Sequence, residues 1–319
     1  IDLNLGSVPG KVGKAVNLCK RIRAIKKIKR KRNIEIIYSF GPTANLANVL
    51  TGGKDKIWVG IRGYGALQDK NSMKRLCRRA DRVICCSKVM ADDVKTQFGA
   101  KDVVCVYNPC DVESIRRLAK EPLPADSQKF FDEGAPVVVA MGREHDVKGF
   151  WHLIKAFALA KKKIPALKLM IVGEGTFAEY RKLAEDLQVE QDVWFTGVQK
   201  NPFAYLKQAS LFVMTSVSEG FPNSLIEAMA VGIPAMSVNC KTGPAEIFLD
   251  DYRKGGDGHT VIEGEYGVLL PVICPEKNLD ASVIEKEEKI MAEQMVKVLT
   301  EPEKLAERKA ASLKRAEDF

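Results

Sequence analysis

The stretch PVVVAMGREHDVKGFWHLIKAFALAKKK, residues 136–163, contains the pattern that decides the fold. Its first six residues form a short apolar run, which predicts a strand buried on both faces. Residues 148–163 then place apolar side chains at helical spacing, after a polar turn that contains glycine. A buried strand followed by such a helix is the repeating unit of an α/β domain with a parallel sheet.

The same unit recurs on both sides of this stretch. Toward the C-terminus we expect strands at 167–173, 192–197, 210–216 and 233–238, with helices at 177–187, 201–209 and 224–232. Toward the N-terminus, apolar runs predict strands at 34–39, 56–61, 82–87 and 102–107. The sequence therefore predicts two doubly wound, Rossmann-like α/β domains, and the cleft between two such domains is the default ligand site.

A segment rich in proline and charge, residues 108–136, is the expected linker. We place the domains at residues 1–120 and 121–319. The first domain shows only four strands, and no Gly-rich turn follows an opening strand. We therefore expect it to be truncated, with two or three β-α units of roughly 30 residues each missing in front.

Composition excludes several classes of protein. The chain has 319 residues, of which 46% are hydrophobic and 29% charged, as in ordinary globular proteins. No apolar run approaches the roughly 20 residues that span a bilayer, and no signal peptide is visible. Eight cysteines without C-x-x-C spacing and only three histidines disfavour a zinc site. The cysteines are interpreted as small buried residues in a reducing cytosol, so the expected localisation is cytoplasmic.

The net charge of +9 is concentrated near the N-terminus. The stretch CKRIRAIKKIKRKR, residues 19–32, carries nine Lys or Arg, and Ile22, Ile25 and Ile28 form a narrow apolar stripe. Two interpretations stay open: a surface helix with solvated lysines, or a helix that docks on an anionic membrane surface such as the inner face of the plasma membrane. Nucleic acid is not an expected partner, because the helix has no aromatic residue to stack on bases.

The stretch SVSEGFPNSLIEAMAVGIP, residues 216–234, follows a predicted strand and begins a predicted helix. Its turn, which contains Gly220 and Phe221, therefore lies at the carboxyl end of a strand. The helix start would present backbone N–H groups that suit a phosphate. These are the amides of Asn223, Ser224 and Leu225.

Two carboxylates, Glu219 and Glu227, lie on either side of this helix start. Both would repel a phosphate, so we expect them to accept hydrogen bonds from hydroxyls that flank it. A nucleoside diphosphate sugar has such hydroxyls on its ribose and on its sugar. The alternative for Glu227 is that it only complements the helix dipole.

Two further turns are predicted to lie at the same edge of the sheet. MGREHDVKGF, residues 141–150, offers Arg143 for bidentate bonding to a diphosphate and Lys148 as a point charge. The alternative is that both are surface charges on a loop. IVGEGTF, residues 171–177, has Gly173 and Gly175 where a ligand could approach the backbone, a weak signal when taken alone.

Taken together, these turns resemble a known family. The order MGR-x4-KG, VGEG, FTG, SEGFPNSLIEAMAVGIP and TGPAEI, within residues 136–270, looks like the nucleotide-sugar domain of family-4 glycosyltransferases. That family has the GT-B fold. SFGPTANLANVL and RADRVICCSKVMADDVKTQFGAKDVVCVYNPCD resemble its acceptor domain.

The resemblance implies a retaining glycosyltransferase that moves a hexose or N-acetylhexosamine from a UDP-sugar. The acceptor would be a glycan or lipid-linked glycan in cell-surface polysaccharide synthesis. It assigns Arg143 and Lys148 to the diphosphate, Glu219 to the donor sugar and Glu227 to the ribose. It assigns the base to backbone groups near Gly197 and Val198. No cofactor or metal is implied, because cationic side chains and a helix start take its place.

The sequence departs from the family pattern at Arg62, which we align with the reaction-centre position where many members have histidine. Two alternatives stay open: a sugar-nucleotide epimerase with the same fold, and a non-catalytic module that binds nucleotide sugars. An acceptor requirement distinguishes a transferase from the epimerase, and binding without turnover would indicate the module.

Overall fold

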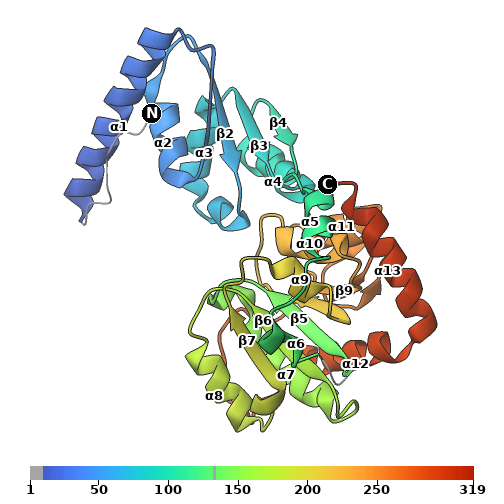
Figure 1. The fold of residues 1–319 in the computed structure, drawn as a ribbon. Coiled ribbons are helices and arrows are strands. Elements are labelled where there is room, and N and C mark those ends of the chain that lie inside the picture. The colour runs from blue at the N-terminus through green and yellow to red at the C-terminus, as the bar shows by residue number, and fades with distance from the viewer. Residues whose placement is uncertain (1–9, 132–133) are drawn as a thin grey trace. The chain divides into compact units, whose positions relative to one another are not determined.

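The computed structural model describes residues 10–131 and 134–319 of the chain. The chain divides into two compact units, Ile1–Tyr107 and Asn108–Phe319. Each unit is an α/β structure built on one sheet (Figure 1). In the two described ranges, no helix has both the length and the apolar character needed to cross a bilayer.

The first unit contains a parallel sheet in the order β1-β2-β3-β4, at the four positions predicted. Val59 and Val83, paired in neighbouring strands, are almost fully buried, which explains the apolar runs. The strands are β1 (Ile36–Phe40), β2 (Lys56–Ile61), β3 (Arg82–Cys85) and β4 (Val103–Cys105). The helices are α1 (Lys11–Arg32), α2 (Pro42–Thr51), α3 (Lys70–Arg79) and α4 (Lys88–Phe98).

The long helix α1 packs on α2, and its apolar stripe is partly covered by this contact. Lys29 is buried and forms an ion pair with Asp55 at 2.6 Å between Nζ and Oδ2. Its ammonium also donates to Thr51 Oγ1 at 2.5 Å. Among the nine cations of residues 19–32, Lys29 therefore holds the helix against its neighbours. The exposed ones are Lys20, Arg23, Lys26, Lys27, Arg30, Lys31 and Arg32.

The second unit contains a seven-stranded sheet in the order β10-β11-β9-β8-β5-β6-β7. All neighbouring strands are parallel except β10, which pairs antiparallel with β11. The strands are β5 (Val137–Met141), β6 (Lys168–Val172), β7 (Val193–Gly197), β8 (Leu211–Met214), β9 (Ala235–Val238), β10 (Ile262–Glu263) and β11 (Val268–Leu270).

Helices cover the second sheet, and its central strands are completely buried. Val138, Leu169 and Val213 have no exposed surface, as the continuous apolar runs predicted. The helices are α5 (Val112–Leu118), α6 (Ala125–Gln128), α7 (Phe150–Lys161), α8 (Ala178–Asp186), α9 (Pro202–Leu206), α10 (Asn223–Ala230), α11 (Pro244–Phe248), α12 (Lys286–Thr300) and α13 (Pro302–Ala316).

The segment expected to be a linker is not irregular throughout. It contains α5 and α6, and α5 packs against α9 and α10 of the second unit. The short strands β10 and β11 and the helix α12 are also absent from the predicted elements. The C-terminal helix α13, red in Figure 1, packs along α10.

Free cysteines occur in both units. Cys77, Cys85, Cys86 and Cys240 are buried, as expected of small apolar residues, and burial raises the pKa of Cys77 to about 11. The other four cysteines are exposed or half-buried.

The strand order of the second sheet fixes where its functional loops meet. From β5 the chain proceeds outward through β6 and β7, and then returns to place β8 on the other side of β5. The loops that follow β5 and β8 therefore flank the point at which the order reverses. In open α/β sheets, this is the place where ligands bind.

Candidate functional site

The loops after β5 and β8 are joined by an ion pair. Lys148 ends the turn after β5, and its Nζ lies 2.6 Å from Oε1 of Glu219 in the turn after β8. The two side chains are only 21% and 15% exposed, so water screens the pair less than it would at an open surface. The structure thus brings together two residues that the sequence assigned to diphosphate and sugar.

Backbone contacts hold the same two loops together. Thr215 donates its hydroxyl to the carbonyl of Lys148 at 2.8 Å, and the amide of Val217 donates to Val147 O at 2.9 Å. Gly149 has φ of 59°, and a Cβ there would lie 2.3 Å from the carbonyl oxygen of Thr215. Only glycine permits this approach, which places Lys148 beside the β8 loop.

The turn that carries Glu219 is fixed from a third loop. Thr242 donates its hydroxyl to the backbone carbonyl of Glu219 at 2.5 Å. Pro222 lies against Gly243, where a Cβ would come within 2.3 Å of the proline ring. The turn therefore has little freedom to move, and the Glu219 carboxylate keeps its direction toward Lys148.

Helix α10 begins at Asn223, directly after this turn, as predicted. The amide of Leu225, however, donates to Pro222 O at 3.1 Å. The expectation that Leu225 offers a free N–H group is therefore wrong for this conformation, because the first turn of the helix already uses it. Asn223 is exposed, and its side chain accepts a hydrogen bond from Asn108 at 2.7 Å.

Glu227 lies one turn into α10 and lines a pocket of about 240 Å³. Burial raises the pKa of its carboxyl group. Cys110 lies in the same lining, and burial, with the charges of Glu227 and Asp111, raises the pKa of its thiol to about 11. The described lining contains no Lys or Arg, so this pocket suits hydroxyl groups better than phosphate. Its other residues are Asn108, Pro109, Ser114, Ile115, Leu118, Phe203, Asn223 and Ile226.

The turns after β5, β6 and β7 also lie side by side. Gly142 N donates to Val172 O at 2.9 Å, and Gly173 N donates to Gly197 O at 3.2 Å. A Cβ on Gly173 would lie 1.9 Å from Gly142 O, so this crossing requires glycine. Arg143 is exposed on the first of these turns, and Val198, 73% exposed, follows the last.

Arg62 belongs to the first unit, where it follows β2 and is exposed. It lines a pocket of about 600 Å³ together with Lys14 and Arg75. Much of the remaining lining is apolar, including Leu46 and Met73. The assignment of Arg62 to the reaction centre stays a prediction.

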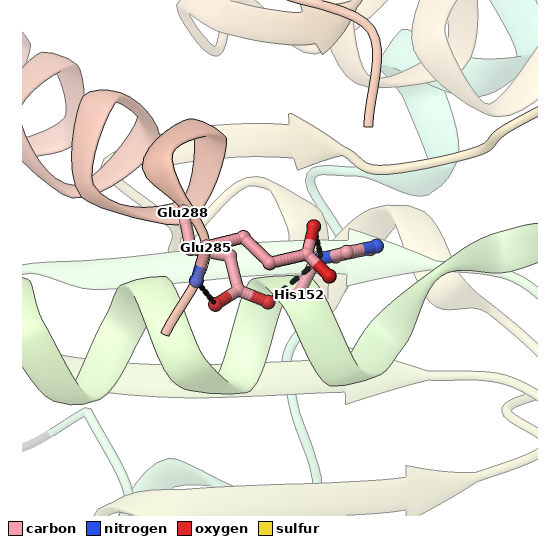
Figure 2. A group of neighbouring side chains, drawn as sticks. All are labelled: His152, Glu285 and Glu288. Atoms are coloured by element: carbon pink, nitrogen blue, oxygen red, sulfur yellow. Dashed lines mark hydrogen bonds and ion pairs between the residues drawn. The ribbon is translucent and has the colours of Figure 1, made fainter. Parts of the chain in front are cut away.

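One cluster within the described residues has the composition of a metal site (Figure 2). His152 of α7 lies 2.7 Å from Glu288 and 3.9 Å from Glu285, measured from Nδ1 to carboxylate oxygens. Two ligands of a tetrahedral zinc ion would lie ~3.4 Å apart, whereas 2.7 Å is a hydrogen-bond distance. The ring is therefore hydrogen-bonded to Glu288.

The other polar atoms of this cluster are held by the backbone. His152 Nε2 donates to Cys274 O at 2.9 Å, and Glu288 accepts from the amide of Glu285 at 2.8 Å in a capping box. Both His152 and Glu288 are completely buried. We interpret the cluster as the attachment of α12 to α7, which fixes the C-terminal helices on the sheet.

Some residues of the site have no strong signal in the sequence. Thr215 and Thr242 act through single hydroxyls, and Asn108 and Cys110 come from the expected linker. The motif NPCD directly after a predicted strand could have indicated the last two, because such positions lie at the carboxyl edge of a sheet.

Comparisons with known proteins identify the family of the chain. Residues 6–114 match glycosyltransferase family 4, and residues 124–256 match glycosyl transferases group 1. An uncharacterised glycosyltransferase of Methanocaldococcus jannaschii is 34% identical over 218 residues, which is 67% of this chain and 53% of that protein.

A second relative is a Campylobacter jejuni enzyme named N-acetylgalactosamine-N,N'-diacetylbacillosaminyl-diphospho-undecaprenol 4-alpha-N-acetylgalactosaminyltransferase. It is 32% identical over 66% of this chain and 52% of its own length. Among solved structures, Anabaena HepE in complex with UDP and glucose has a TM-score of 0.71 and 18% identity, covering 97% of this chain and 79% of that one.

The protein is thus of the GT-B class of α/β proteins, as its structural neighbours show. Within that class, the chain belongs to the family-4 glycosyltransferases. It spans about half the length of the curated relatives it matches, 53% and 52% for the two named here.

The raised pKa of Glu227 predicts a pH-dependent cost in stability. Because its folded pKa lies above its unfolded value, the native state holds the proton between these two values while the unfolded state releases it. Stability should therefore fall as pH rises through this window. Glu227→Gln removes the cost, so its free energy of unfolding relative to wild type should be higher at pH 8 than at pH 4.

Urea unfolding at the two pH values, followed by tryptophan fluorescence, measures this difference. Glu293→Gln on the exposed face of α12 is the control and should show no such pH dependence. If the free energies of unfolding of wild type and Glu227→Gln differ by the same amount at pH 4 and at pH 8, the carboxyl group is not buried as described.

Proposed function

We propose that the full-length protein transfers a hexose or N-acetylhexosamine from a UDP-sugar to a glycan or lipid-linked glycan. The reaction would serve cell-surface polysaccharide synthesis and retain the donor's anomeric configuration. The observation that carries the proposal is the Lys148–Glu219 pair at the reversal of strand order, beside the start of α10 and the pocket of Glu227. The names of the Campylobacter relative and of the UDP-bound structure support the donor and acceptor classes.

The charges divide the site into parts with different tasks. Arg143, Lys148 and the amides at Asn223 and Ser224 offer positive potential for a diphosphate. Glu227, in a pocket whose described lining residues include no Lys or Arg, would accept hydrogen bonds from the ribose hydroxyls. Glu219, held by Lys148, would accept them from the transferred sugar.

In this arrangement the ion pair prepares the site for the donor. Lys148 is neutralised by Glu219 before the donor arrives, so the partly buried site does not hold an uncompensated charge. With the diphosphate bound, the ammonium would contact both the phosphate and Glu219. As negative charge develops on the leaving phosphate, Lys148 and Arg143 would stabilise it without a metal ion.

Binding of UDP to this chain tests the diphosphate assignment. Arg143→Ala and Lys148→Ala should each weaken binding by about 1.5–3 kcal/mol, roughly 10- to 150-fold, the worth of a charge-assisted hydrogen bond. Lys148→Ala should have the larger effect, because it also leaves the Glu219 carboxylate unpaired beside the phosphate. Titration calorimetry measures both variants.

Lys163→Ala, an exposed lysine just after α7, is the control and should bind UDP like wild type. Unchanged affinity for UDP in both Arg143→Ala and Lys148→Ala would show that the diphosphate does not bind at this loop.

The stereochemistry can be tested without knowing the acceptor. Slow hydrolysis of UDP-[1-¹³C]glucose or UDP-N-acetylglucosamine by the full-length protein should first release the α-anomer, because a retaining enzyme delivers water to the face the nucleotide leaves. Proton NMR resolves the small anomeric coupling before mutarotation. The rate should persist in excess EDTA. Initial release of the β-anomer, or a strict need for Mn²⁺ or Mg²⁺, would overturn this part of the proposal.

The exposed cations of α1 are proposed to hold the protein on anionic membranes. Since the apolar stripe already packs on α2, the attraction should be electrostatic and lost at high salt. Each surface cation contributes about 1 kcal/mol near an anionic bilayer. Lys26→Glu/Lys27→Glu/Arg30→Glu should therefore abolish co-sedimentation with phosphatidylglycerol vesicles at 0.1 M salt.

The same vesicles at 0.5 M salt, and neutral phosphatidylcholine vesicles, are the controls and should retain little protein. Equal binding to neutral and anionic vesicles would contradict the proposal and favour the alternative that α1 is a surface helix with solvated lysines.

A further inference from the structure

The turn that carries Glu219 packs against Phe319. Phe221, two positions after Glu219, is only 5% exposed, and its ring centroid lies 5.4 Å from that of Phe319. The rings are inclined by 55°, and their separation lies within the range of interacting aromatic pairs. Lys148 and Thr242 hold the turn at Glu219, whereas Phe319 supports it at Phe221.

Phe319 is itself held in place by several elements. Its backbone oxygen accepts a hydrogen bond from the amide of Cys110 at 3.0 Å, and the guanidinium of Arg315 lies 5.2 Å from its ring centroid. Arg315 in turn donates to Ile247 O at 2.9 Å and to Glu246 O at 2.8 Å in α11. Phe319 follows α13, which ends at Ala316. Its position is set by the backbone contact to Cys110 and by Arg315, which joins α13 to α11.

A second arginine joins the same segment to α10. Arg116 of α5 donates to Leu313 O at 2.9 Å and to Ala230 O at 3.2 Å, and it forms an ion pair with Glu317 at 2.8 Å. Ala230 is the last residue of the helix that carries Glu227. The C-terminal segment 313–319 thus contacts the turn of Glu219, the C-terminal end of the Glu227 helix, and Cys110 in the lining of the Glu227 pocket.

We propose that Phe319 is a positioning residue for the candidate donor site. Its ring keeps Phe221 packed and so holds the turn from Glu219 to Asn223 in the conformation that binds a nucleoside diphosphate. Phe319 itself lies outside the described lining of the Glu227 pocket and acts through Phe221. The proposal rests on the proposed function for the identity of the ligand, but the ordering of the turn is a property of the protein alone.

The test compares Phe319→Ala with Phe130→Ala in this chain. Phe130 is also a half-buried phenylalanine of the second unit, packed 4.9 Å from Trp194 in an aromatic cluster outside the described lining of the pocket. Both variants lose one ring. Amide hydrogen exchange in peptides covering residues 216–226 should be faster by about tenfold in Phe319→Ala and unchanged in Phe130→Ala.

The affinity for UDP, measured by titration calorimetry, should fall about fivefold or more in Phe319→Ala only, because part of the binding energy must then order the turn. Phe319→Tyr, which keeps the ring, should restore both readouts. This rescue separates the role of the ring from a general loss of stability.

Equal effects of Phe319→Ala and Phe130→Ala on exchange and affinity would overturn the proposal, as would unchanged exchange in the turn. Faster exchange with unchanged UDP affinity would overturn the claim that this order serves the ligand. If the wild-type chain binds no UDP, the proposed function fails, and the exchange comparison still decides whether Phe319 orders the turn.

Discussion

The contact between Lys148 and Glu219 depends on the reversal of strand order between β5 and β8. The two residues are 71 positions apart in sequence, and only this reversal brings the ends of their strands side by side. Gly149 permits the close approach of the two loops. The hydroxyls of Thr215 and Thr242 donate to the backbone carbonyls of the two paired residues. The strand order of the sheet therefore determines that these two charged side chains meet at the site.

Glu219 and Glu227 have different environments although they lie on either side of one helix start. Glu219 is compensated by an ammonium at 2.6 Å. Glu227 lies in a small pocket whose described lining has no cation, and burial raises its pKa. A carboxylate in such a place destabilises the folded state, a cost that function can justify. Hydroxyl donors from a ligand would offset it, which is the physical reason for assigning the ribose to Glu227 and the phosphates to the other side of the helix start.

The strands and the site loops could be predicted from the sequence because a parallel sheet buried on both faces requires near-continuous apolar runs. The segment 56–61 is an example in which predicted and observed strands coincide. The strands β10 and β11 have two and three residues, too few for periodicity to be recognised. Helix α5 could not be distinguished from a linker because its stability comes from packing on α9 and α10 rather than from its own pattern.

Long-range contacts are the part of the site that the sequence could not provide. Residue types indicated that Lys148 and Glu219 belong to a site, but not that they touch. Nothing in the sequence links Phe319 to Phe221 or Cys110 to Glu227, since those contacts exist only once α13 and α5 have packed on α10. A general rule failed at the amide of Leu225. A helix start is expected to offer free N–H groups, but the tight first turn of α10 already uses this one in a hydrogen bond to Pro222 O.

The most direct test of the central claim is a crystal structure of the chain with UDP bound. The account predicts diphosphate oxygens within hydrogen-bond distance of Lys148 Nζ and the amides at the start of α10, with the ribose hydroxyls on the carboxylate of Glu227. A nucleotide bound elsewhere, or a diphosphate placed against Glu227 with the ribose near Lys148, would contradict it.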